Sequence, residues 1–195
     1  MVWDTIAPKQ AIAQSKQDWH IIIASRNLPR VEEAVLQLTA ETNYSFIEGM
    51  TLDLASLASV RQFVQDFQAR EHPPLHAIVC NAGVQIVSGT RYTENGFEMT
   101  FGVHHLEHFL LVNLLLPQLS DRSRIVFVSS DTHNPEANTG MPHPNYQDAN
   151  ALAFPTGDDN QMDIRTLGRV RYTTSKLCNL LCTYSNLRSS PLQKW

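Results

Sequence analysis

Several features that would point to whole classes of protein are missing from the 195-residue sequence. No apolar run approaches the ~20 residues that a membrane-spanning helix needs. The three cysteines, Cys80, Cys178 and Cys182, form neither a C-x-x-C pair nor an even-numbered framework, which argues against a disulfide scaffold. Met1 is not followed by a basic segment and an apolar stretch of the kind that directs secretion. We therefore expect a cytoplasmic protein with reduced, buried cysteines and no membrane span.

Positive charge is also scarce. Lysine and arginine total 15 against 19 aspartate and glutamate residues, and the formal net charge is −4. The chain therefore has no basic footprint for nucleic acid, and no block of like charges marks a disordered interaction tail. With 43% hydrophobic residues it is long enough for one sizeable core and too short for two, so we expect a single domain over residues 1–195.

Short apolar runs alternate with helical patterns along most of the chain. Strands are predicted at residues 20–25, 45–53, 75–80 and 124–129, and helices at 28–41, after Ser56, at 97–116 and from before Tyr172 to about 188. This alternation predicts a parallel sheet covered on both faces, the doubly wound α/β architecture. No strand is evident before residue 20. Residues 131–168, rich in Pro, Asn, Asp and Gly, are interpreted as a functional loop or a partly disordered segment.

Tyr172 and Lys176 stand four residues apart in a predicted helix, so their side chains share one helix face. A phenol titrates near ~10, and a neighbouring ammonium lowers its pKa by favouring the phenolate. Such a pair can act as a general acid/base, protonating a carbonyl oxygen while hydride reaches the carbon, or the reverse on an alcohol. Taken alone, the same spacing also fits an ordinary solvated helix face.

Two further motifs accompany this pair. Asn81-Ala82-Gly83 ends one predicted strand, and Ser129-Ser130 ends the next. With Tyr172 and Lys176, in this order, they resemble the N-A-G, catalytic serine and Y-x-x-x-K of the short-chain dehydrogenase/reductase family. The similarity extends over roughly residues 14–188 and is strongest to the branch that contains retinol-dehydrogenase-like and protochlorophyllide-reductase-like proteins.

This resemblance implies an NADP(H)- or NAD(H)-dependent oxidoreductase with a small-molecule carbonyl, alcohol or C=C substrate. Tyr172 would be the acid/base, and Lys176 would lower its pKa and bind the nicotinamide ribose. Ser130 would orient the substrate oxygen, since a hydroxyl both donates and accepts. The other reading of such a serine, a strand-end hydroxyl that satisfies backbone groups, suits Ser129 better.

The cofactor preference is predicted from the residue that follows the strand at 20–25, which corresponds to the second strand of the family's fold. That strand end approaches the adenosine ribose, where an acid accepts from the 2′-hydroxyl and an arginine accommodates a 2′-phosphate. Here it carries Arg26, which favours NADP(H) over NAD(H), unless Arg26 is only a solvated residue at a helix start. Asp53 and Leu54 resemble the family's adenine-contacting D-L, although an aspartate there can also be a helix cap. Asn81-Ala82-Gly83 would border the cofactor.

The family's Gly-rich turn, T-G-x-x-x-G-x-G, is missing. The first glycine of the sequence is Gly49, whereas in these folds the phosphates rest on backbone N–H groups approached closely through glycine. The missing piece normally includes the central first strand. Its loss would separate the strands at 20–25 and 45–53 from those at 75–80 and 124–129. The family's C-terminal strands are also absent after Ser189, so we expect an incomplete Rossmann-like fold, truncated at both ends.

Three histidines occupy the long predicted helix, at positions 104, 105 and 108. His104 replaces an asparagine of the family's proton relay, so it either holds a water near Lys176 or leaves the relay broken. His104 and His108 share a helix face, the spacing of metal ligands. Two of the three positions bind no metal in the family, and we expect no metal site.

Two functional hypotheses remain open from the sequence. The first is the NADP(H)-dependent oxidoreductase with catalytic residues Ser130, Tyr172 and Lys176, assisted by His104. The second is a catalytically inactive fragment or interaction module that needs a partner to complete its sheet, because unpaired strand edges recruit other chains. The resemblance also allows a homo-oligomer. The substrate itself is not readable, since specificity in such folds resides in loops around the site.

Overall fold

The computed structural model describes residues 19–156 and 162–189. Its first half alternates strand and helix as predicted, in the order β1 (Ile21–Ser25), α2 (Leu28–Thr42), β2 (Ile47–Thr51), α3 (Leu57–Gln68) and β3 (Leu75–Cys80). Residues 1–18, where the sequence predicts no strand, lie outside the described residues, as do residues 190–195.

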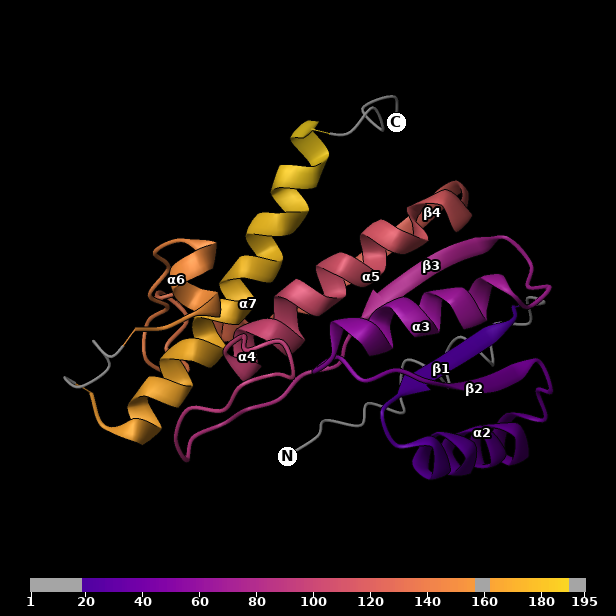
Figure 1. Cartoon of the computed structure of the whole chain (residues 1–195), viewed down its shortest axis with the longest axis horizontal. Helices are drawn as coiled ribbons and strands as arrows, with labels where there is room; N and C mark the ends of the chain where they lie inside the picture. The colour runs from indigo at the N-terminus through magenta and orange to yellow at the C-terminus, as the bar shows by residue number, and fades with distance from the viewer. Residues whose placement is uncertain (1–18, 157–161, 190–195) are drawn as a thin grey trace.

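The second half is dominated by helices. Its elements are α4 (Met99–Phe101), the π-helical turn η1 (Gly102–Leu106), α5 (Glu107–Leu115), the 3₁₀ turn η2 (Leu116–Gln118), β4 (Leu119–Phe127), the 3₁₀ turn η3 (Asp131–His133), α6 (Ala149–Ala153) and α7 (Ile164–Ser189). In Figure 1, α2 lies along β1 and β2 at one end of the molecule, whereas α7 passes beside α4 and η1 at the other.

The strands form two separate parallel pairs rather than one sheet. β1 pairs with β2 from Ile21↔Ile47 to Ser25↔Thr51, and β3 pairs with β4 up to Cys80↔Phe127. Among the described residues no strand joins the two pairs. This confirms the separation predicted from the missing first strand, because that strand is the one expected between β1 and β3.

Local signals explain the two helices that flank the strand pairs. The Asn27 side chain accepts a hydrogen bond from the Arg30 backbone N–H at the start of α2, and Pro29 occupies the first turn as predicted. Ser56 caps α3 in the same way, by accepting from the Ser59 N–H. These caps supply partners for backbone N–H groups that have none within the helix.

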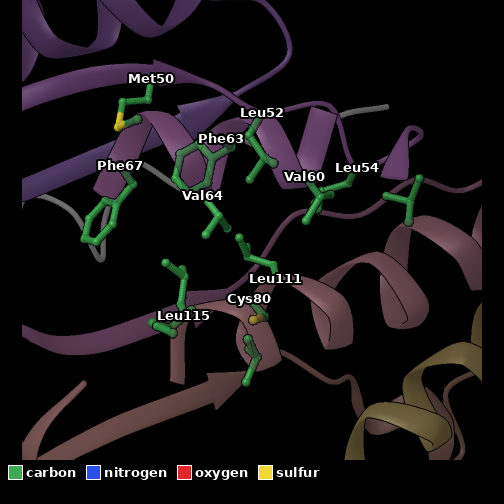
Figure 2. Close-up of a cluster of buried hydrophobic side chains, with 13 residues drawn as sticks. Met50, Leu52, Leu54, Val60, Phe63, Val64, Phe67, Cys80, Leu111 and Leu115 are labelled. Atoms are coloured by element: carbon green, nitrogen blue, oxygen red, sulfur yellow. The ribbon is translucent and has the colours of Figure 1, made fainter. Parts of the chain in front are cut away.

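The apolar stripe predicted for α3 builds the main core. Val60, Phe63, Val64 and Phe67 are all buried. Figure 2 shows this stripe facing side chains of α5 and β3; those labelled on the opposite side are Leu111, Leu115 and Cys80. Fully burying one such large apolar side chain contributes about 1.5–3 kcal/mol, so this cluster holds α3 and α5 in place against the strands.

The predicted long helix at 97–116 is not a single α-helix. Helical structure runs from Met99 to Gln118, but Gly102–Leu106 forms a π-helical turn between α4 and α5. A π turn accommodates one extra residue and commonly occurs at functional sites. Here it places His104 inside the protein, fully buried and facing the helix that carries Tyr172.

Strand β4 begins earlier and ends earlier than predicted. It covers Leu119–Phe127 instead of residues 124–129, and its pairing with β3 shifts register between Leu75 and Ala77. The irregularity coincides with Arg122, whose φ of 64° is unusual for a side-chain-bearing residue. After Leu119 the first residues of β4 are polar, Ser120 to Arg124, so nothing in the sequence indicated a strand there and the predicted start was too late.

The loop-like segment at 131–168 contains short helices, η3 and α6, before α7 begins; residues 157–161 lie outside the described residues. α7 then passes very close to the chain after β3. A Cβ built on Gly168 would lie 2.0 Å from the Ile86 carbonyl oxygen, so glycine is required for this approach.

The longest helix, α7, has 26 residues, and Arg165, Arg169 and Lys176 interrupt its apolar positions. Throughout residues 19–156 and 162–189, no helix combines the length and the apolar character needed to cross a bilayer.

Candidate active site

The site predicted from the sequence lies where α7 crosses the chain that follows β4. The Lys176 ammonium donates a hydrogen bond to the Val128 carbonyl at 3.1 Å, and the Ser129 hydroxyl donates to the Lys176 carbonyl at 2.7 Å. Ser129 therefore satisfies a backbone group, the role predicted for it. Together these bonds fix α7 against the strand end that carries Ser130.

Tyr172 lies beside both of its predicted partners. The Lys176 Nζ is 5.7 Å from the centroid of the Tyr172 ring, and the Ser130 side chain forms a hydrogen bond with Tyr172. The Asp131 carboxylate, 3.1 Å from the Ser130 hydroxyl, is an alternative acceptor for its single proton. The structure thus brings serine, tyrosine and lysine together around one phenol.

The pKa of Tyr172 is raised, whereas the Tyr–Lys spacing predicted a lowered value. Burial is the largest cause, and the Asp131 carboxylate adds to it, while the hydrogen bond with Ser130 acts in the opposite direction. The ammonium does not offset these effects because it lies over the ring face and binds the Val128 carbonyl. At neutral pH Tyr172 is therefore a protonated hydrogen-bond donor.

Lys176 is almost completely enclosed, with only 6% of its surface exposed. Burial lowers the pKa of its ammonium. The Val128 carbonyl that it binds also accepts from the Asn179 amide at 3.2 Å. A buried cation held by a backbone carbonyl supplies positive charge at a fixed point next to Tyr172.

His104 uses both ring nitrogens inside the protein. Its Nε2 accepts from the Val84 backbone N–H at 2.6 Å, so its Nδ1 carries the proton and donates to the Ser175 hydroxyl at 2.7 Å. Ser175 in turn donates to the Tyr172 carbonyl. Burial and the positive charge of Lys176 hold the pKa of His104 well below its usual value, so the ring is neutral.

The Asn81-Ala82-Gly83 motif contacts this histidine. A Cβ on Gly83 would lie 2.8 Å from the His104 Nε2, which explains why glycine stands there. The proposed relay function of His104 remains a prediction. Its observed role is to join the segment after β3 to the helix that carries Tyr172.

The other two histidines of this region have different partners. His105 hydrogen-bonds Asn179 at 3.1 Å and its ring stacks between those of Phe101 and Phe109. His108 donates from Nδ1 to the His104 carbonyl at 3.2 Å. The ring nitrogens of histidines 104, 105 and 108 therefore do not converge on one point.

The residues predicted to contact the adenosine half of a cofactor follow β1 and β2. Arg26 is exposed directly after β1. Asp53 accepts from the Ala55 N–H at 2.9 Å in a turn that precedes α3, whose N-cap is Ser56, so the helix-cap reading considered for Asp53 is wrong. Leu54 is buried in the main core. Arg26 and Asp53 thus lie beyond the carboxyl ends of neighbouring parallel strands, where such folds bind ligands.

Glu107 is a buried acid to which the sequence assigned no role, although it stands where the family has glycine. It is fully enclosed, and neither carboxylate oxygen has a hydrogen-bond partner among the residues that the structure describes. Burial raises its pKa to about 7; the Asp53 carboxylate adds to the rise, and Arg61 opposes it. An acid among the apolar residues of the predicted helix was the sequence signal that could have indicated a buried carboxylate.

The sequence also assigned no role to Ser175 and Asn179. Their roles follow only from their hydrogen bonds to distant residues, His104 for Ser175 and His105 for Asn179.

Comparison with known proteins identifies the family. The family model described as short chain dehydrogenase matches residues 4–142. The chain belongs to the short-chain dehydrogenase family. The match confirms the family resemblance predicted from the sequence and does not favour an interaction module; it includes the Asn81-Ala82-Gly83 and Ser129-Ser130 motifs and ends before Tyr172.

Two curated relatives illustrate the range of similarity. The chain is 49% identical over 122 residues to polyprenol dehydrogenase of Danio rerio, covering 60% of this chain and 37% of the relative. It is 37% identical over 192 residues to the chloroplastic protochlorophyllide reductase of Daucus carota, covering 90% of this chain and 46% of the relative. The chain thus spans less than half the length of these relatives.

Solved structures agree with the fold. An uncharacterized protein from Mycobacterium paratuberculosis matches with a TM-score of 0.71 and 28% identity, covering 94% of this chain and 57% of that chain. The predicted Rossmann-like α/β fold is confirmed, in an incomplete form whose described strands make two pairs.

Proposed function

We propose that this protein is an NADP(H)-dependent oxidoreductase that acts on the carbonyl or alcohol group, or a C=C bond, of a small molecule. The observation that carries this proposal is the convergence of Ser130 and Lys176 on the Tyr172 side chain. In a reduction the protonated phenol would donate its proton to the substrate oxygen, because the raised pKa of Tyr172 keeps it a donor at neutral pH.

The neighbouring groups would assist this transfer. The Ser130 hydroxyl can hold the same substrate oxygen, and the Lys176 ammonium, held on the Val128 carbonyl beside the Tyr172 ring, would bind the nicotinamide ribose. The nicotinamide cofactor, when bound, supplies or accepts the hydride. The hydrogen bonds through His104 and Ser175 fix the backbone of α7 at Tyr172, which positions the phenol.

The chain offers residues for the nicotinamide and adenosine parts of such a cofactor, but no glycine-rich turn for the pyrophosphate between them. Lys176 and Tyr172 suit the nicotinamide ribose, and the exposed Arg26 suits a 2′-phosphate. Asp53 and Leu54 are the proposed neighbours of the adenine, and Asn81-Ala82-Gly83 that of the nicotinamide side. Residues 1–48 contain no glycine, so the close backbone approach to a pyrophosphate has no counterpart there.

The relatives' names support the proposed reaction class. One is a dehydrogenase and the other a reductase, which are the two directions of the same hydride chemistry.

We further propose that residues 1–195 act as one domain. The exposed apolar side chains of Phe109, Leu181 and Tyr184, on α5 and α7, support association of two copies through these helices.

A substrate screen with NADPH and a panel of ketones, aldehydes and enones tests the proposal. Tyr172→Phe should lower kcat/KM by more than about 100-fold, since it removes the transferred proton. The matched control is Tyr92→Phe, an exposed tyrosine in the connection from β3 to α4, which should retain full activity. Equal turnover by the wild type and Tyr172→Phe would contradict the assigned mechanism.

A further inference from the structure

A second cluster of chemically active side chains lies at the opposite ends of the strands. His20 precedes β1, Glu48 is the second residue of β2, and His72 lies in the connection from α3 to β3. One ligand atom from each of these residues lies within 4.8 Å of those of the other two. This is the only such group of three histidine, cysteine, aspartate or glutamate residues in the part of the chain that the structure describes.

His72 is oriented as metal-binding histidines are. Its Nδ1 donates to the Phe67 backbone carbonyl at 3.2 Å, so Nε2 is the ring nitrogen that faces Glu48. The Nε2 is in direct hydrogen-bonding contact with the Glu48 Oε1. The side chain of His72 is only 7% exposed, so its ring cannot turn freely into solvent.

His20, directly before β1, completes the arrangement. Its Nε2 is 3.7 Å from the same Glu48 oxygen, and its ring meets the His72 ring edge to face, with centroids 5.1 Å apart. Two ligand atoms that each lie about 2.1 Å from a tetrahedral ion are roughly 3.4 Å apart. Small side-chain movements therefore suffice to place one ion among the three ligand atoms.

Arg70 fixes the orientation of the carboxylate. Its Nη1 contacts the Glu48 Oε2 at 3.2 Å and leaves Oε1 to face the two imidazoles. The side chains of His20 and Glu48 are 29% and 28% exposed, so an ion and a water can reach them. A carboxylate held from behind by a hydrogen-bonding group is typical of ordered metal sites.

We propose that His20, Glu48 and His72 bind one divalent ion of the zinc class, with water as the fourth ligand. Two imidazole nitrogens and one carboxylate oxygen suit such borderline ions better than Ca²⁺ or Mg²⁺, which prefer oxygen donors alone.

The position of the site points to a structural role. The ion joins the β1–β2 pair to the connection that leads into β3, and no strand in the described residues makes this link. Its ligands are at the amino ends of the strands, whereas Ser130 and Asn81 follow the carboxyl ends. Binding should therefore stabilise the fold by mass action without taking part in the proposed oxidoreductase chemistry.

Calorimetric titration of the 195-residue chain with Zn²⁺, in a reducing buffer without chelators, tests this proposal. One ion per chain should bind, and the melting temperature should rise with Zn²⁺ concentration. Glu48→Gln and His72→Ala should each weaken binding at least about tenfold, since even the loss of a supporting second-shell group has that effect. His76→Ala removes an exposed nearby histidine outside the cluster and should bind as the wild type does.

The coordination chemistry gives an independent readout. Co²⁺ bound to two nitrogens and an oxygen should give visible absorption without an intense sulfur-to-metal band. Such a band would place the ion on a cysteine and overturn the proposal. Equal Zn²⁺ affinity of the wild type and Glu48→Gln would overturn it as well, as would failure of the folded wild type to bind. Circular dichroism of each metal-free variant separates loss of a ligand from loss of the fold.

Discussion

The Nδ1 of His104 and the hydroxyl of Ser175 are 2.7 Å apart, and their hydrogen bond joins the π-helical turn η1 to helix α7. His104 has no exposed surface and Ser175 is 1% exposed. The same serine donates to the Tyr172 carbonyl, and the same histidine accepts from Val84. One continuous set of hydrogen bonds therefore runs from the end of β3 to the proposed catalytic tyrosine.

Substituting Ser175 tests the energetic weight of this connection. Ser175→Ala leaves the buried N–H of His104 without an acceptor, which should lower the free energy of unfolding by about 1–3 kcal/mol. Urea denaturation followed by circular dichroism measures the change. Ser88→Ala, in the exposed loop after β3, serves as the control and should leave the midpoint unchanged. A wild-type midpoint for Ser175→Ala would show that water replaces the hydroxyl.

Acidification should destabilise the protein through His108. Burial lowers the pKa of His108 from its usual 6.5 to about 4. Between these values the unfolded state binds the proton and the folded state does not, so stability is present above about pH 6.5 and is lost as the pH falls. From pH 7 to pH 5 this one group should account for about 2 kcal/mol. Urea unfolding of His108→Gln at pH 7 and pH 5 should show a decrease in the free energy of unfolding that is smaller than that of the wild type by this amount. An equal decrease in both proteins would mean that another group causes the pH dependence.

Glu107 should affect the free energy of unfolding in the opposite direction from His108, by destabilising the protein as the pH rises. Its pKa is raised from 4.5 to about 7, so the folded state keeps a proton that the unfolded state releases. Stability from this group is present below about pH 4.5 and is lost as the pH rises through 7. Glu107→Gln should therefore be more stable than the wild type at pH 8 by about 3 kcal/mol, and by much less at pH 5. A pH-independent difference between the two proteins would contradict the assigned pKa.

The close passage of α7 can be tested at Gly168. Alanine favours helix over glycine by about 1 kcal/mol, so an unconstrained Gly168→Ala would stabilise the protein. The added Cβ would instead collide with the Ile86 carbonyl oxygen, 2.0 Å away, and should lower stability by about 1–3 kcal/mol. Thermal and urea unfolding decide the sign. Arg165→Ala in the exposed first turn of α7 controls for helix propensity.

Much of the fold could be predicted because its signals are local. Ser56 and the apolar stripe of α3 reveal a capped, one-sided helix without knowledge of its partner. The separation of the described strands into two pairs was also predictable, since the sequence predicts no strand before residue 20 and the family's first strand is the one expected between β1 and β3. The resemblance of the motifs to the family is what predicted one site with Ser130, Tyr172 and Lys176, and the catalytic roles of these residues remain a prediction.

What the sequence did not reveal depends on contacts between distant segments. The π turn around His104 has no residue signature, since its extra residue is stabilised by Val84 and Ser175. The direction of the Tyr172 pKa shift depends on burial and on where the Lys176 ammonium points. The His20, Glu48 and His72 cluster comes from three elements whose sequence spacing matches no metal motif.

The central claim, that the chain retains an NADP(H) site, is tested most directly by calorimetric titration of the 195-residue chain with NADPH and NADH. Arg26 should favour NADPH by about tenfold, the effect of one charge-assisted contact with the 2′-phosphate. Arg26→Ala should bind both cofactors equally, whereas Arg30→Ala, an exposed arginine in the first turn of α2, should keep the preference. A folded chain that binds neither cofactor, or binds both equally with Arg26 in place, would contradict the proposal.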